Sequence, residues 1–283
     1  MSRSETGDAN AVATGDHTLL IGLGRAAAGA LLFTLPILMT METWWLGFSV
    51  EPLRLALLLV MTLPLLVGLS RIGGFRRTSS ILQDGADACI AIAIAALAAT
   101  GLLWVFGVLS PEMPLSEIIG KIAVQITPGA IGAMLARSQL GSSGNDAKRY
   151  QMEDSYPGEL FVMVAGALFL SLNIAPTEEV LLIGYQMSIW QQLGLLVLTL
   201  ALMHGFVYEL DFSGSASVTR TGGFWSLFLR FTIAGYVLVA LVSLYVLWTF
   251  GRLDGTSAIN IVSMVVVLSF PGAIGAAAAR IIL

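Results

Sequence analysis

The chain has 283 residues, of which 57% are hydrophobic and only 11% are charged, and its mean hydropathy is +0.86. A soluble domain carries about 25% charged residues, so this composition excludes an ordinary soluble protein and predicts a polytopic membrane protein. The net charge of −4 and the scattered basic residues exclude nucleic acid as an expected partner and leave the lipid bilayer as the main one.

Residues 1–17 are polar and acidic and contain no apolar run. They therefore do not read as a signal peptide, and we predict that they form a disordered tail.

Eight apolar segments follow, and each is long enough to cross a hydrocarbon core that needs about 20 helical residues. Backbone groups in lipid must be hydrogen-bonded within the segment, and these runs do not alternate as barrel strands do. The predicted fold is therefore all-α, with helices near residues 25–48, 52–70, 86–109, 115–137, 158–176, 189–210, 225–250 and 258–281.

The second half of the sequence repeats features of the first half in the same order. With a shift of 137 the early matches are Gly29-Ala30-Leu31 with Gly166-Ala167-Leu168, Glu42 with Glu179, Thr62 with Thr199 and Gly68 with Gly205. With a shift of 143 the element Pro-Gly-Ala-Ile-Gly-Ala at 128–133 matches the same element at 271–276. We interpret this as an internal duplication of a four-helix unit. It gives a first membrane repeat at 18–137, a cytoplasmic linker at 138–157 and a second membrane repeat at 158–283.

Four crossings return the chain to the side that it left, so the two repeats are expected to be parallel, with a pseudo-two-fold axis along the membrane normal. Only Arg54, Lys121 and Arg252 fall on the side away from the termini. The basic residues on the side of the termini are Arg3, Arg25, Arg71, Arg76, Arg77, Arg137, Lys148, Arg149, Arg220, Arg230 and Arg280. This distribution predicts that both termini are cytoplasmic, in a bacterial inner membrane.

From Arg25 to its end the chain resembles an uncharacterised family of bacterial multi-pass integral membrane proteins. The resemblance rests on the doubled Pro-Gly-Ala-Ile-Gly-Ala element and on the run from Asn173 to Glu179. It implies an integral membrane protein and transfers no functional residue.

The two prolines of the doubled element lie near mid-membrane, since Pro128 is nine residues, or about 13 Å, from the boundary residue Arg137. Pro128 and Pro271 are expected to break their helices and free carbonyl groups, with Gln125, Thr127 and Ser269 nearby. One interpretation is that the two broken helices face each other and form a binding or permeation path. The other is that the glycines beside the prolines only let these two helices approach each other closely.

Three glutamates are expected near the non-cytoplasmic surface. Helical rise places Glu42 about 25 Å and Glu179 about 30 Å from the cytoplasmic boundary. Together with Glu178 they are candidates for a cation or proton site. Alternatively, Pro176 to Glu179 begin a new short helix, where acidic side chains are favoured.

His204 is expected about 9 Å inside the cytoplasmic boundary, where either a packed histidine with Tyr208 as partner or a proton relay would fit. Lys121 and Glu117 are expected to neutralise each other at i, i+4. Asp84, Asp87 and Arg230 are expected at the membrane boundary, where an Asp87–Arg230 pair would have a structural role.

The sequence has no His-Glu-x-x-His, Gly-x-Ser-x-Gly or phosphate-binding glycine loop, so neither enzymatic activity nor a cofactor is expected. A transporter or channel for a small cation or proton is the function that the sequence favours. A membrane scaffold or sensor component is the alternative. The sequence does not predict an oligomeric state.

Overall fold

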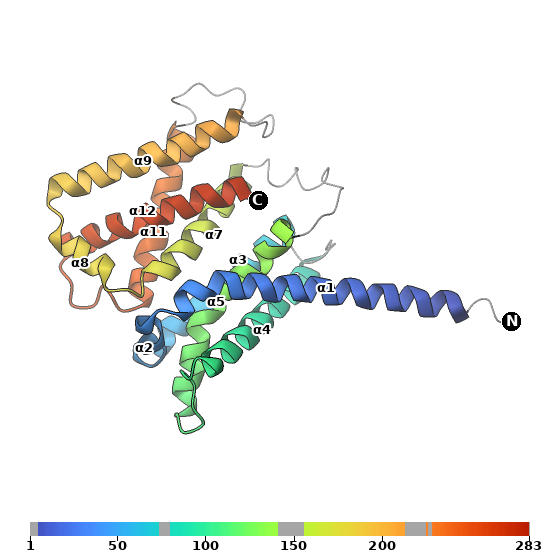
Figure 1. The fold of residues 1–283 in the computed structure, drawn as a ribbon. Coiled ribbons are helices and arrows are strands. Elements are labelled where there is room, and N and C mark those ends of the chain that lie inside the picture. The colour runs from blue at the N-terminus through green and yellow to red at the C-terminus, as the bar shows by residue number, and fades with distance from the viewer. Residues whose placement is uncertain (1–4, 74–79, 141–155, 213–224, 226–227, 283) are drawn as a thin grey trace.

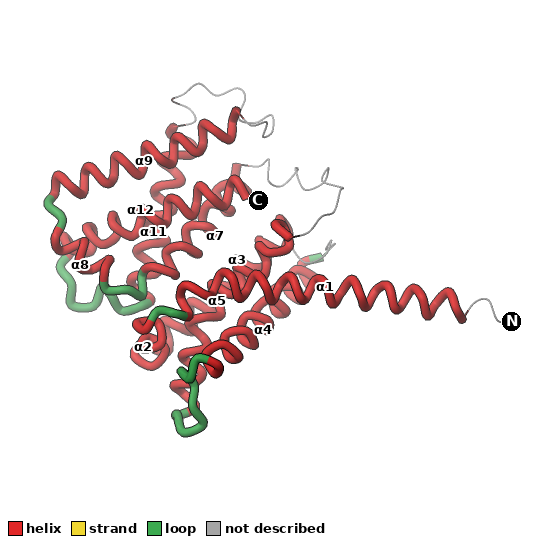
Figure 2. Tube along the Cα trace, viewed as in Figure 1, coloured by secondary structure: helices red, strands yellow, loops and turns green. Residues whose placement is uncertain are grey.

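The computed structural model describes residues 5–73, 80–140, 156–212, 225 and 228–282. All elements in these ranges are helical (Figure 1). Figure 2 shows that loops account for only a small part of the described chain. The predicted all-α fold is confirmed.

The helices form two groups, which we call the first half and the second half. The first half consists of α1 (Glu5–Leu38), α2 (Met41–Ser49), α3 (Pro52–Gly73), α4 (Ile81–Val105) and α5 (Leu115–Leu140). The second half consists of α7 (Tyr156–Ile174), α8 (Glu179–Gln186), α9 (Ile189–Phe212), the π-helical turn η2 (Phe228–Ile233), α11 (Ala234–Thr249) and α12 (Ala258–Ile282).

Among the described residues, seven helical segments are long and apolar enough to cross a membrane, with η2 and α11 counted as one. An eighth is the bent pair formed by Gly22–Leu38 of α1 and by α2, which meet at 88°. The single helix expected over 25–48 is therefore divided into two helices. Pro36, in the last turn of α1, has no N–H for the helical ladder.

Side chains satisfy the backbone where α1 gives way to α2. The Thr40 hydroxyl donates to the Pro36 carbonyl at 2.8 Å, and the Trp44 indole N–H donates to the Leu38 carbonyl at 2.7 Å. These bonds replace the lost helical ones, as a break at membrane depth requires. In the second half the short helix expected at Glu179 is confirmed, because α7 ends at Ile174 and α8 begins at Glu179.

Residues 5–17, predicted as part of a disordered tail, form the first part of α1, while 1–4 lie outside the described residues. Acidic residues such as Glu5 and Asp8 favour a helix start. At 34 residues, α1 is about 51 Å long, more than the roughly 30 Å of a hydrocarbon core. Its N-terminal part extends well beyond the other helices (Figure 1).

The predicted linker over 138–157 is helical at both of its ends. α5 continues to Leu140 and α7 begins at Tyr156, whereas residues 141–155 lie outside the described residues.

Glycines allow the closest helix contacts in each half. A Cβ atom added to Gly132 of α5 would lie 2.7 Å from the Gly29 carbonyl oxygen of α1, and one added to Gly275 of α12 would overlap the Gly166 carbonyl of α7. Such approach of backbones is the usual way in which membrane helices associate. These glycines therefore pack α5 and α12 closely, but each against a helix of its own half and not against each other.

The two proline-containing helices are not broken and do not meet in the way that we expected. α5 and α12 continue as helices through Pro128 and Pro271. α5 packs along α1 and α12 packs along α7, each within its own half. The main contacts between the halves instead join α7 to α1, α3 and α5, and α3 to α11. The glycines explain this, because they hold each helix against its own neighbour.

The same helix pairs recur in both halves. α5 contacts α1, α2, α3 and α4, and α12 contacts their counterparts α7, α8, α9 and α11. The contact between the halves is less regular, since α3 reaches the second half whereas the main neighbours of α9 are α12 and η2. The duplication and its pseudo-two-fold axis stay a prediction, with which the recurring pairs agree.

We predict that adding one methyl group at Gly275 destabilises the protein. Gly275→Ala introduces a Cβ against the α7 backbone, and overpacking of this kind costs about 1–3 kcal/mol. The control is Gly194→Ala on α9, where no atom lies within 4 Å and the better helix former is expected to be neutral or stabilising. Thermal unfolding midpoints in detergent measure both. Equal midpoints for the two variants would contradict the packing role of Gly275.

Candidate functional site

Two of the candidate glutamates, one from each half, act on the same arginine. Arg252 follows α11, and the negative charges of Glu178 and Glu42 both act on its guanidinium. Its Nη2 also donates to the carbonyl of Pro176, between α7 and α8. The three charged side chains form what we call the Arg252 cluster, at the end of the molecule that carries α2 and α8.

Two opposing effects act on the pKa of Arg252. Burial lowers the pKa of the guanidinium, and the two glutamates oppose this shift. Arginine stays charged because its ordinary pKa is so high. One partly buried positive charge therefore lies under the influence of two carboxylates, one on α2 of the first half and one in the α7–α8 connection of the second.

Glu179 has a more local role than we expected. It is exposed, and its own backbone N–H is the main reason why its pKa is lowered. The charged form is thus favoured at the N-terminus of α8. This contribution is present above the pKa of the unfolded chain and is lost as the pH falls through the lowered value. Glu178, rather than Glu179, shares Arg252 with Glu42.

A second polar contact joins the halves at the same end. Arg54 of α3 contacts Asp254 through two hydrogen bonds of 2.9 and 3.0 Å, and it donates to the Trp248 carbonyl at 2.9 Å. Its guanidinium also lies 5.0 Å from the Trp248 ring centre and 3.0 Å from Glu51. Sequence reasoning missed this contact. Its partners lie about two hundred residues apart, and nothing in one sequence links them.

Lys121 and Glu117 form the ion pair that we expected, with a distance of 2.6 Å. The Lys121 side chain is only 7% exposed, and its ammonium also approaches the Val108 carbonyl at 3.4 Å. The matching position in the second half is Met264. The pair has a structural role, since each partner neutralises the other.

The polar candidates of the first half are buried but separate. Thr127 shares a hydrogen bond of 2.9 Å with Thr62, whose hydroxyl also reaches the Leu58 carbonyl. Gln125 is fully buried, and its amide oxygen and nitrogen have no hydrogen-bond partner among the described residues. Pro128 is buried beside them on α5.

The polar candidates of the second half lie among further hydroxyl groups. Ser269, two residues before Pro271, donates to Ser243 of α11 at 3.4 Å, and both side chains are fully buried. Ser171 of α7 is also fully buried, and its hydroxyl has no hydrogen-bond partner. The sequence analysis did not single out Ser171 or Ser243. Ser171 matches Thr34 of the first half, which also carries a hydroxyl group, whereas Ser243 matches the apolar Ala99.

His204 of α9 forms a hydrogen bond with Thr232 of the π-helical turn η2. Its Nδ1 lies 3.0 Å from the Thr232 hydroxyl of η2, and its ring packs edge-on against Phe228 at 5.4 Å. The side chain of Tyr208, the partner that we expected, lies outside the described residues. The π turn was not predicted, because its hydrogen-bond register leaves no mark in the apolar pattern.

The aspartates expected at the membrane boundary lie near the start of α4 and are buried within the protein. Asp84 and Asp87 are only 2% and 1% exposed, because α4 begins at Ile81 and carries both inward. Asp84 pairs with Arg71 at 2.8 Å. Arg230, expected opposite Asp87, instead lies over the Tyr156 ring at 5.3 Å.

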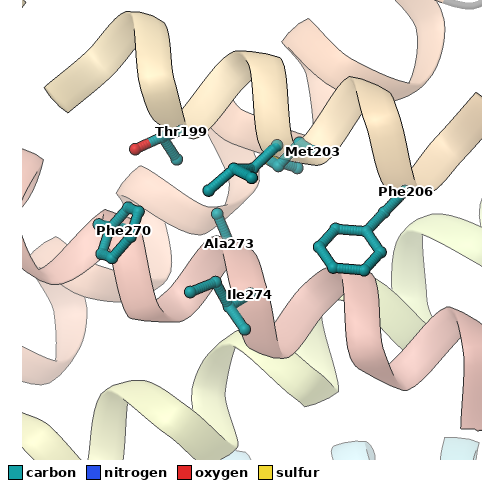
Figure 3. A pocket seen from close by; sticks show the side chains of 7 residues that line it. Thr199, Met203, Phe206, Phe270, Ala273 and Ile274 are labelled. Carbon is teal, nitrogen blue, oxygen red and sulfur yellow. The ribbon is translucent and has the colours of Figure 1, made fainter. Parts of the chain in front are cut away.

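The crevice between α9 and α12 does not hold these candidates. It is lined by Thr199, Leu202, Met203, Phe206, Phe270, Ala273 and Ile274 (Figure 3). Its lining is apolar apart from Thr199 and contains no ionisable group. Within the described part of the chain, no three His, Cys, Asp or Glu side chains are grouped in a way that could hold a metal ion.

We predict that neutralising the two partners of the Lys121–Glu117 pair has unequal effects. Glu117→Gln strands the ammonium, which is 7% exposed, whereas Lys121→Met strands a carboxylate that is 24% exposed and can reach water. The first variant should therefore lower the unfolding midpoint more. The double variant should recover part of the loss, with a coupling of roughly 0.5–3 kcal/mol. If the effects of the two single variants are additive in a double-mutant cycle of unfolding in detergent, the ion pair contributes nothing to stability.

Comparison with known proteins agrees with a membrane protein. No curated protein and no solved structure matches the chain. The family described as "Putative integral membrane protein (DUF2391)" matches residues 22–283. This match covers most of the chain and confirms the resemblance to an uncharacterised membrane family. The protein therefore belongs to this family of integral membrane proteins.

Proposed function

We propose that the protein transports a small cation, the proton included, across the membrane. The observation that carries this proposal is the Arg252 cluster. Glu42 and Glu178 come from different halves, and the charges of both act on one arginine, beside both places where a membrane helix gives way to a short one. Transport proteins commonly place their sites between two halves and at interrupted helices.

The charge at this end supports the choice of a cation. Arg54 and Lys121 are each paired with acidic groups, and Arg252 lies between two glutamates. Glu179 and Glu112 add further negative charge on exposed side chains. An acidic entrance raises the local concentration of cations and repels anions.

The contact between the halves leaves room for relative movement. It is made by few helix pairs, and the polar bonds of Arg54 across it lie at the end with α2 and α8. In this proposal the Arg54 contact and the Arg252 cluster hold that end closed, and competition for Glu42 and Glu178 by a cation loosens it.

The proposal also includes the orientation of the chain in the membrane and a function without catalysis. We place both termini in the cytoplasm of a bacterial cell, because the basic residues favour that side. The chain ends lie on the same side of the bundle (Figure 1), as an even number of crossings requires. We propose no catalysis, since the sequence has no hydrolase or zinc motif.

The test measures ion flux into vesicles that contain the purified protein. Glu42→Gln with Glu178→Gln should reduce the flux, because both carboxylates act on Arg252. Glu112→Gln is the matched control, since it removes one exposed charge at the same end and none from the cluster. Absence of flux above empty vesicles for protons, sodium, potassium and calcium would overturn the proposal.

A scaffold or sensor component is the second candidate. α9 favours it, since only 11% of its apolar window is buried and a partner helix could cover the rest. Co-purification of a stoichiometric membrane partner would support this function, provided that Glu42→Gln and Glu178→Gln leave the cellular phenotype of the protein unchanged. Loss of the phenotype in those variants would oppose it.

A further inference from the structure

The short helix α2 connects two helices that each cross the membrane without it. α1 has 34 residues, so its last 20 residues, about 30 Å long, cover a hydrocarbon core. α3 has 22 residues, about 33 Å, and runs back from the surface at which α1 ends. The nine residues of α2 span only about 14 Å, and α2 is turned by 88° from the last part of α1. α2 therefore lies near the plane of the membrane, at the surface where α1 ends and α3 begins.

α8 has the same place in the second half. It lies between α7, which has 19 residues, and α9, which has 24. Each of these two helices is long enough to cross the core alone, whereas the eight residues of α8 are not. Both short helices are therefore connections at one membrane surface.

The side chains of α2 fall into three sectors around its axis, because successive residues on a helix are about 100° apart. The first sector is apolar and exposed, and it consists of Met41, Trp45 and Phe48, with exposed fractions of 70%, 58% and 51%. The second sector follows it around the axis, is polar, and consists of Glu42 and Ser49. The third sector is buried and consists of Thr43, Leu46 and Gly47.

Contacts of α2 with the rest of the protein fix which sector points outward. A Cβ atom added to Gly47 would lie 2.6 Å from the Lys121 Cα of α5, so the two backbones touch there. The Trp44 indole is held by its hydrogen bond to the Leu38 carbonyl. With the buried sector against α5, the apolar sector on the opposite side has to face away from the protein.

α8 repeats this distribution with different residues. The positions that match Trp45 and Phe48 are Leu182 and Tyr185, which are 55% and 53% exposed. The positions that match Glu42 and Ser49 are Glu179 and Gln186, which are polar and exposed. The match of Gly47 is the buried Gly184, where an added Cβ would lie 3.0 Å from the Met264 side chain of α12. Ile183 is exposed as well, at 43%, so the apolar sector of α8 is wider than that of α2.

Further aromatic side chains mark the level of the membrane surface at this end. Trp104 lies in the last turn of α4 and is 68% exposed, and Trp190 lies in the first turn of α9 and is 79% exposed. α4 ends and α9 begins at the surface that carries α2 and α8. Tryptophan and tyrosine are enriched where the hydrocarbon core meets the headgroups. Trp45 and Tyr185 therefore lie at the end of the protein where such a belt is formed.

We propose that α2 and α8 lie flat in the membrane interface and bind lipid. The apolar sector of each helix inserts at the boundary between headgroups and acyl chains, the polar sector faces water, and the buried sector packs on the protein. The partner of the exposed apolar surface is thus the phospholipid leaflet at the end with α2 and α8. This inference does not rest on transport.

The physical chemistry of the two outer sectors favours lipid over water and sets the depth of α2. In water, Met41, Trp45 and Phe48 would form an exposed apolar surface, which soluble surfaces avoid. Amphipathic helices at a membrane surface place their apolar face about 5–10 Å into the boundary between headgroups and acyl chains. Deeper insertion would carry Glu42 and Ser49 into the core, where a charged group is costly. The lipid contact thus holds Glu42 on the water side of α2.

The test measures how often oxygen and a water-soluble nickel chelate collide with nitroxide labels on the full-length protein. The protein is purified in nanodiscs of zwitterionic phospholipid, in a Cys89→Ser background. Labels are attached through Trp45→Cys and Phe48→Cys in the apolar sector and through Ser49→Cys in the polar one. The matched control is Glu112→Cys, an exposed position in the connection between α4 and α5. We expect oxygen to dominate at positions 45 and 48, and the nickel chelate to dominate at 49 and 112.

Two results would overturn the inference. If the nickel chelate reaches positions 45 and 48 as freely as position 112, the apolar sector faces water in the purified protein and awaits a protein partner. If oxygen dominates at position 49 as it does at 45, the whole helix lies within the bilayer. Leu182→Cys and Gln186→Cys make the same comparison on α8, which tests the inference even if a variant of α2 does not fold. Ion flux, present or absent, leaves these results unchanged, so the inference and the proposed function fail separately.

Discussion

Close contact between glycine-bearing helix surfaces is the constraint on which the rest of the structure depends. Lipid tails are as apolar as leucine side chains, so membrane helices gain no hydrophobic energy by pairing and depend on close packing. Gly132 against Gly29, and Gly275 against Gly166, bring α5 onto α1 and α12 onto α7. Because these pairs form within each half, the proline segments stay continuous helices and the halves meet through other surfaces.

The polar groups then fall into three structural settings. Lys121 with Glu117, and Asp84 with Arg71, neutralise buried charges within the first half. Arg54 and Arg252 connect the halves at the end with α2 and α8. The hydroxyl groups around Gly272 and the contact of His204 with Thr232 lie inside the second half. One scaffold can thus carry different chemistry in its two halves.

Much of the fold could be predicted from local features of the sequence. Apolar length gave the number of membrane segments, and the run from Pro176 to Glu179 gave the short helix α8. The spacing of Glu117 and Lys121 gave their ion pair, because i, i+4 residues are neighbours on a helix. The doubled glycines gave the close packing, although the helix that each of them touches did not follow from their spacing.

Features that depend on long-range geometry could not be predicted. The bend after Leu38 follows backbone and side-chain bonds that hydropathy does not record. Arg54 and Asp254 are far apart in sequence, and the π turn changes only the hydrogen-bond register. The burial of Asp84 and Asp87 within the protein was not predicted, because the apolar run begins after them whereas α4 begins at Ile81.

Cysteine cross-linking tests the central claim about helix pairing most directly, in a Cys89→Ser background. Thr34 with Gly129, and Ser171 with Gly272, are matched pairs in which an added Cβ would lie 3.3 and 3.0 Å from the facing side chain. Cysteines at either pair should form a disulfide under mild oxidation, while cysteines at Gly129 and Gly272 should not. Efficient cross-linking between positions 129 and 272, with none within the two matched pairs, would contradict the account.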